Sequence, residues 1–67
     1  MKIKKNQRKV GGHIYALEVG RDPLSPHDFC WTIYRDGFYH AQAGSWLTAY
    51  EAGIAGATAL SLIPRGK

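Results

Sequence analysis

The sequence predicts an α+β fold, in which one C-terminal helix packs on one face of a three-stranded antiparallel sheet (βββα). Two observations predict it. Three segments rich in β-forming residues are separated by turn signals, and a helix-capping motif precedes the last segment. The 67 residues suffice for one domain. Cys30 is the only cysteine, so neither an internal disulfide nor a cysteine-based zinc site can support the core.

The first strand is expected at residues 13–19, because apolar side chains alternate there along one face. The alternating residues are Tyr15, Leu17 and Val19. Pro23 and Pro26 then predict a loop over residues 20–28. Such a loop is long for a hairpin connection, and long loops often carry function.

The second and third strands are expected at residues 29–34 and 38–43, joined by a turn at Asp36-Gly37. The turn has two interpretations, because a slip of one residue exchanges the faces of the third strand. A three-residue loop with a bulge at Gly37 places Tyr39, Ala41 and Ala43 beside Trp31 and Ile33. A two-residue turn places Phe38, His40 and Gln42 there instead. We favour the first, which turns the polar side chains outward.

The helix is expected from Ala49 to about Leu62, ending before Pro64. Thr48 and Glu51 form the capping box that opens it. Small residues share one side of this helix and predict a close approach to the sheet. They are Ala52, Ala55, Gly56 and Ala59, and Ile63 continues the same side. Gly53 and Gly56 each cost about 1 kcal/mol of helix stability, and close packing would offset that cost.

Positive charge is concentrated at the ends of the chain. The first ten residues carry five basic side chains and no acid, whereas residues 11–64 carry two basic and five acidic ones. We therefore divide the chain into a basic flexible arm, 1–10, and a single βββα domain, 11–67. Basic termini often bind nucleic acid through electrostatic attraction to its phosphates. The arm's basic residues are Lys2, Lys4, Lys5, Arg8 and Lys9.

The sequence indicates neither an enzyme nor a cofactor or metal site. Its three histidines, His13, His27 and His40, lie on different segments, and no glycine-rich phosphate loop precedes the helix. We expect no small-molecule substrate. No apolar run reaches the length of a membrane span, and no secretory signal is visible, so we expect a cytoplasmic protein without a membrane partner.

Part of the chain resembles the double-stranded-RNA-binding domain family. Pro26-His27 is similar to that family's loop that enters a minor groove. Gly44-Ser45, followed by an alanine-rich helix, resembles the family's closing segment. The resemblance implies the three strands and last helix, and it implies a nucleic-acid contact for His27. The lysine cluster that opens the family's last helix has no counterpart at residues 46–49.

The βββα layout, with Trp46-Leu47 and Glu51-Ala52, also resembles the plant ethylene-response-factor domain and the arm-binding domains of phage integrases. Those families read DNA with side chains on the sheet. In this sheet Arg35, at the turn, is the arginine offered for such a role. In size and layout the chain is further similar to phage anti-defence proteins, the anti-CRISPR proteins among them, which bind an effector protein.

Two functions follow as hypotheses. The first is a non-enzymatic module that contacts DNA or RNA through the basic arm, assisted by His27 and Arg35. The second is an inhibitor or adaptor that docks on a nucleic-acid-handling protein. Its contacts would come from the uncovered sheet face or from the back of the helix. These partner-binding residues are Tyr34, His40, Gln42, Tyr50 and Ile54. A homodimer through the helix back or a sheet edge is compatible with both.

Overall fold

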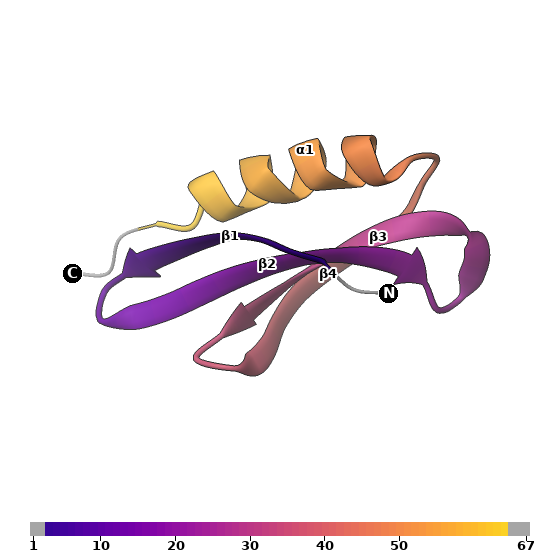
Figure 1. Cartoon of the computed structure of the whole chain (residues 1–67). Coiled ribbons are helices and arrows are strands. Elements are labelled where there is room, and N and C mark those ends of the chain that lie inside the picture. The colour runs from indigo at the N-terminus through magenta and orange to yellow at the C-terminus, as the bar shows by residue number, and fades with distance from the viewer. Residues whose placement is uncertain (1–2, 65–67) are drawn as a thin grey trace.

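The computed structural model describes residues 3–64, and among them the side chains of residues 6–64. Its elements are β1 (Ile3–Val10), β2 (His13–Asp22), β3 (Ser25–Arg35), β4 (Phe38–Trp46) and α1 (Ala49–Ser61). The strands form one antiparallel sheet in the order β1-β2-β3-β4, and α1 covers one face of it (Figure 1). The α+β class and the C-terminal helix are confirmed, but the sheet has four strands instead of three.

The extra strand is the segment that we expected to be a flexible arm. β1 pairs antiparallel with β2, and the ladder ends with Val10 opposite His13. Gly11 and Gly12 have φ angles of 58° and 83°, so they form the two-residue turn that suits a twisted hairpin. The basic residues had concealed this strand. Charges are frequent on edge strands, because they discourage pairing with other chains.

The prediction of a long loop at residues 20–28 is wrong as well. β2 and β3 continue through this region and leave only Pro23 and Leu24 between them. The buried carboxylate of Asp22 stabilises the tight connection by accepting the Leu24 N–H at 2.9 Å. Its other oxygen accepts the N–H of Ser45 at 3.0 Å, which ties the end of β4 to this hairpin.

The turn between β3 and β4 follows the interpretation that we did not favour. Asp36 and Gly37, with φ angles of 51° and 87°, form a two-residue turn between the paired Arg35 and Phe38. The bulge lies farther along β4, at His40. Asp36 also fixes this turn to β2, since its N–H donates to the Ile14 carbonyl at 2.8 Å.

Because the bulge lies at His40 and not at Gly37, some residues of β4 lie on a different face from the one that we predicted. Beyond it, Ala41 lies opposite Ile33, so this alanine is on the helix side as predicted. Before it, Tyr39 lies opposite Tyr34 and faces away from the helix, contrary to the prediction. The bulged His40 was expected on the uncovered face, but its ring lies 5.2 Å from that of Tyr15, on the helix side.

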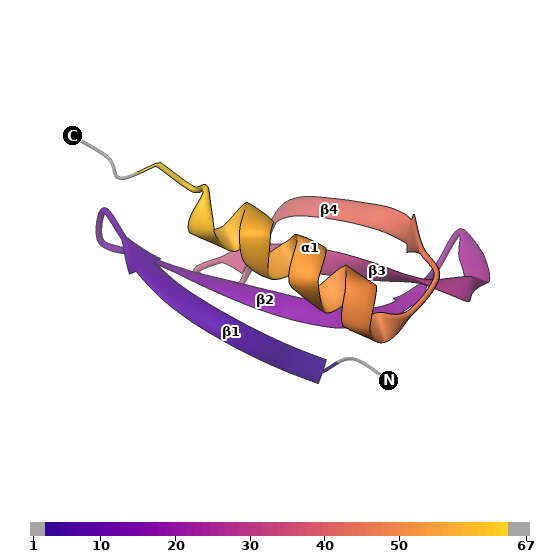
Figure 2. The ribbon, with the colours of Figure 1, turned by 90° about the horizontal axis from the view of Figure 1, so that it is seen from above.

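The core lies between α1 and the sheet. Tyr15, Leu17 and Val19 are buried there, as their alternation predicted. α1 runs above β2 and β3, with β1 and β4 to either side (Figure 2). A Cβ atom added at Gly56 would lie 2.6 Å from Leu17 Cδ1 and 2.8 Å from Trp31 Cβ. The prediction that small helix residues permit close approach is therefore confirmed at Gly56.

The ends of α1 also agree with the sequence. Thr48 is the N-cap, and its Oγ1 accepts the N–H of Glu51 at 3.0 Å. The helix ends at Ser61, before Pro64. Its buried side is centred on residues one turn apart, namely Ala52, Gly56 and Leu60. Tyr50 and Ile54 are exposed on the outer side.

Candidate functional site

The sheet face opposite α1, called the open face below, is not covered by any described element (Figure 1). The strand register arranges its side chains in rows that run across the sheet. One row joins Glu18, Thr32 and Gln42, and the backbone of Lys4 lies opposite Glu18 at its end. The next row joins Ala16, Tyr34 and Tyr39.

The open face is hollowed. It contains a cavity of about 240 Å³. The lining residues are Glu18, Gly20, Arg21, Pro23, Cys30, Thr32, Tyr34, Tyr39 and Gln42. Two register shifts in the β3–β4 ladder accompany the hollow, one near His40 and one beside Ser45, which has a φ of 66°. Bulges bend a strand and increase its twist, so they curve the edge of a sheet.

The floor of this cavity is a small polar network. Cys30 and Thr32 are buried, with exposed fractions of 5% and 7%. The Gln42 amide nitrogen donates to Thr32 Oγ1 at 3.2 Å and to Cys30 Sγ at 3.6 Å. Glu18 is half-buried at the edge, and it forms no hydrogen bond or ion pair with another side chain in the range 6–64. The network fixes Gln42, and it does not include the Glu18 carboxylate.

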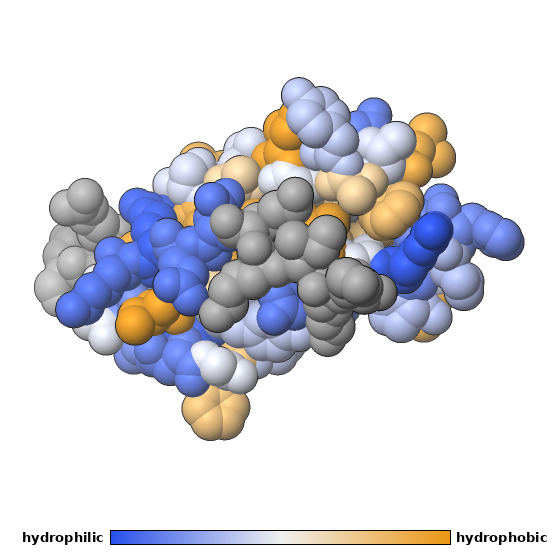
Figure 3. All heavy atoms as spheres, viewed as in Figure 1, coloured by the Kyte–Doolittle hydropathy of each residue, from blue (hydrophilic) through white to orange (hydrophobic). Residues whose placement is uncertain are grey.

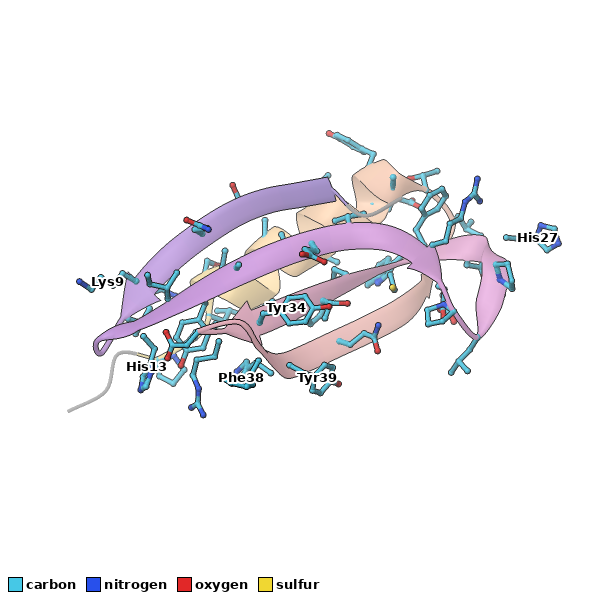
Figure 4. The ribbon with its side chains drawn as sticks, turned by 60° about the horizontal axis from the view of Figure 1, so that its bottom comes forward. Lys9, His13, His27, Tyr34, Phe38 and Tyr39 are labelled. Atoms are coloured by element: carbon cyan, nitrogen blue, oxygen red, sulfur yellow. The ribbon has the colours of Figure 1, made fainter. Side chains whose placement is uncertain are left out.

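Two tyrosines stand at one end of the cavity. Tyr34 and Tyr39 are directly opposite each other in the β3–β4 ladder, and both line the hollow. Figure 4 shows them on neighbouring strands of the open face, with Phe38 beside them at the turn. Tyr39 is 65% exposed. Aromatic rings on an uncovered sheet are the usual platform on which unpaired bases stack.

β1 brings basic residues to the border of this face. Lys9 is exposed and lies opposite Ile14, so the register places it on the open-face side of the sheet. Hydrophilic residues gather around the end of β1 that leads into the β1–β2 turn (Figure 3). We had treated Lys9 as part of an arm independent of the sheet. The structure instead fixes it on β1, two strands from Tyr34 and two residues beyond Gln7, which is the β1 residue in the Tyr34 row.

Arg8, which we grouped with the phosphate-binding residues, points toward the helix side of the sheet. Its Nη1 donates to the carbonyl oxygens of Leu60 and Ile63, at 2.7 and 3.0 Å. A cation at this position satisfies carbonyls at the helix C-terminus and complements the helix dipole. Arg8 therefore fastens α1 to β1.

The other predicted nucleic-acid contacts do not converge on one place. Lys2 lies outside the described residues, and the side chains of Lys4 and Lys5 are likewise outside the described set. His27 projects from the β2–β3 end of the molecule (Figure 4). Arg35 is eight residues along the same strand, roughly 26 Å away at the rise of an extended chain. One short ligand at either end would not contact both.

Near Arg35, a carboxylate links two strand ends. Asp36 Oδ1 accepts the N–H of Ile14 at 2.9 Å, and Oδ2 lies 2.6 Å from Nδ1 of His13. The backbone hydrogen bond from Ile14, and then the hydrogen bond from His13, hold the pKa of Asp36 below its usual range. Among the described residues, no three His, Cys, Asp or Glu side chains are grouped so that they could hold a metal ion.

The partner-binding residues predicted from the sequence separate into two surfaces. Tyr34 and Gln42 belong to the open face, whereas His40 does not. Tyr50 and Ile54 lie one turn apart on α1, beside a groove of about 200 Å³ between the helix and β1. The groove floor is formed by small residues and Asn6.

Sequence reasoning missed Tyr39 as a site residue. The signal was present, because Asp36-Gly37 is the residue pair typical of a two-residue hairpin turn, and that turn places Phe38 opposite Arg35. Sequence reasoning also gave no role to Glu18, which lies on the open face. That role depends on the hollow, which bulges create and which alternation cannot predict.

The chain matches no protein-family model, and no curated protein or solved structure matches it. Within residues 3–64, α1 is too short and too weakly apolar to cross a membrane. Any function must therefore be argued from the open face and the helix back themselves.

Proposed function

We propose that the protein is a non-enzymatic module that binds single-stranded nucleic acid across its open face. Tyr34 and Tyr39 stack on bases, and the basic residues of β1 contact phosphates. One observation carries the proposal: β1 belongs to the sheet, so Lys9 borders the same uncovered face that presents the tyrosine pair. Stacking supplies affinity without sequence preference, and lysines add a salt-dependent contribution.

The geometry favours a single strand over a duplex. Stacking on Tyr39 needs a base whose flat face is free, which a duplex does not offer. Duplex recognition of the double-stranded-RNA-binding type would use lysines at the start of the last helix. Ala49–Ser61 contains no basic residue, and the first turn carries the acidic Glu51. The resemblance to the double-stranded-RNA-binding domain therefore supports the arrangement of strands and helix more than it supports binding to a duplex.

Fluorescence anisotropy with labelled single-stranded and duplex oligonucleotides, over a salt series, tests the proposal. Tyr39→Ala should weaken single-strand binding about 5- to 150-fold, since stacking on one aromatic ring is worth about 1–3 kcal/mol. Tyr50→Ala is the matched control, because Tyr50 is similarly exposed but lies on the helix back. Absence of binding at low salt, or an equal loss in both variants, would contradict the proposal.

A second variant tests the phosphate contacts. Lys9→Gln should weaken binding to all sequences alike and lower the slope of affinity against salt by about one. Gln removes the charge but keeps an unbranched polar side chain, and it leaves the backbone pairing of β1 with β2 in place. An unchanged salt slope would remove Lys9 from the interface.

A second candidate function rests on a different surface. Tyr50 and Ile54 are 77% and 52% exposed and stand beside the groove between α1 and β1. This surface suits an inhibitor or adaptor of the anti-CRISPR type, or a homodimer. A pull-down from nuclease-treated host lysate, with wild type and Ile54→Lys, separates it from the first proposal. Partners that survive nuclease and are lost in Ile54→Lys support it. Light scattering of the same two proteins reports whether the partner is a second copy.

A further inference from the structure

Two side chains on facing sides of the open-face cavity, Glu18 and Gln42, offer unused hydrogen-bond acceptors. Glu18 presents a carboxylate, and no described side chain occupies it. Gln42 donates its amide N–H groups to Thr32 Oγ1 and Cys30 Sγ, so its carbonyl oxygen remains as an acceptor for a ligand. A ligand that fills the cavity beside the half-buried Glu18 must therefore present donors to its carboxylate, whereas the exposed Gln42 can direct its carbonyl oxygen to water. Burial of the Glu18 carboxylate without donors would be costly.

The cavity also sets the size of the ligand. Its volume of about 240 Å³ is below the roughly 300–1,000 Å³ typical of pockets for drug-sized molecules. The tyrosine pair stands at one end and the half-buried Glu18 at the side. A single flat ring system that stacks on a tyrosine thus brings its edge toward the carboxylate.

Among the nucleobases, guanine alone matches a carboxylate with two neighbouring donors. Its Watson–Crick edge places N1–H beside the N2 amino group, so both can donate to one carboxylate. Adenine and cytosine each place an acceptor nitrogen beside the amino group. Thymine and uracil place carbonyl oxygens on both sides of a single N–H. A site built to form hydrogen bonds rejects analogues that leave its buried groups unpaired.

We propose that the open-face cavity selects guanine in single-stranded nucleic acid, with Glu18 as the specificity-determining residue. This inference rests on the proposed single-strand binding and adds base recognition to it. Tyr34 and Tyr39 hold the base by stacking, which tolerates any base. Glu18 then discriminates through a paired hydrogen bond to N1–H and N2–H. Gln42, held by Thr32, keeps the opposite wall in a fixed orientation.

The test uses the full chain and short labelled thymidine oligomers that carry one central guanine, adenine or cytosine, or none. A single guanine avoids association between oligomers. The guanine oligomer should bind about 5- to 150-fold more tightly than the others, the discrimination typical of one bidentate contact. Glu18→Gln should abolish this preference, so that the guanine oligomer binds no more tightly than the thymidine-only oligomer. The matched control is Glu51→Gln, the same substitution on α1 outside the cavity, which should retain it.

The outcomes separate the two proposals. If all oligomers bind equally, or if Glu18→Gln keeps the guanine preference, base recognition by Glu18 is overturned and single-strand binding stands. If no oligomer binds at low salt, the proposed function fails and this inference fails with it. Because Glu18 is on the sheet surface, circular dichroism of Glu18→Gln should match that of wild type.

Discussion

Replacing Gly56 by alanine is a direct test of how α1 meets the sheet. Alanine stabilises the interior of a helix by about 1 kcal/mol relative to glycine. The new methyl group would lie 2.6 Å from Leu17 Cδ1 and 2.8 Å from Trp31 Cβ. The Trp31 atom is attached to the β3 backbone, so the helix must move, and such overpacking costs about 1–3 kcal/mol. The net expectation is a loss of about 0–2 kcal/mol.

Gly53→Ala supplies the matched control. Gly53 lines the groove between α1 and β1 instead of the helix–sheet contact, and the gain in helix propensity should stabilise the protein by about 1 kcal/mol. The gain in helix propensity is common to both variants, and their difference isolates the steric cost of about 1–3 kcal/mol. Thermal unfolding followed by circular dichroism measures it, at about 4–8 °C per kcal/mol for a domain of this size. Equal stabilisation by the two substitutions would refute the close approach at Gly56.

Three further changes test the contacts that frame the site. Arg8→Ala should lower the free energy of unfolding by about 1–2 kcal/mol, because it leaves helix-end carbonyls unpaired, whereas Lys9→Ala, measured in the same urea titration, should change it by less than about 0.5 kcal/mol. Thr48→Ala removes the helix N-cap and should cost about 1 kcal/mol in that assay. The lowered pKa of Asp36 means that its ionised form stabilises the fold, so this contribution is present above the unfolded pKa of about 3.9 and is lost as the pH falls through the lower folded value. Asp36→Asn should therefore reduce the acid dependence of the melting temperature below about pH 4, and an unchanged profile would contradict the assignment.

The parts of the fold that depend on local chemistry were predictable. The capping box at Thr48 and the alternation of Leu17 and Val19 are signals carried by neighbouring residues, and the structure confirms both. β1 was not predictable from the same signals, because its charges serve edge protection and mask its alternation. The Gly11-Gly12 pair was the available clue, since two consecutive residues with positive φ are what a tight hairpin requires.

The candidate site was harder to predict for a different reason. The two-residue turn at Asp36-Gly37 places Tyr39 on the open face, opposite Tyr34. The bulge at His40 then returns Ala41 to the helix side, and the sequence does not mark the position of that bulge. The hollow around Glu18 depends on the curvature that such bulges give to the sheet. The positions of Tyr34 and Gln42 on the open face followed from simple alternation on the flanking segments. Alternation therefore identified part of the site, and long-range register completed it.

The structure also changes what a deletion of residues 1–9 would mean. For an independent arm, the deletion would remove charge and leave the domain intact. In the structure it removes β1, including the Arg8 contacts with α1, and it leaves β2 as an edge strand with an apolar alternating face. We expect the truncated chain to lose cooperative unfolding and to aggregate, as exposed apolar edges do.

Circular dichroism and light scattering of the truncated chain measure these effects. A folded, monomeric product would show that β1 is dispensable for folding. The basic residues of this segment would then act as an arm that is independent of the domain. Loss of nucleic-acid binding on deletion is therefore uninformative about phosphate contacts, since loss of the sheet would produce the same result. Lys9→Gln avoids this ambiguity, because it keeps the backbone pairing of Lys9 with Ile14 and changes only the charge.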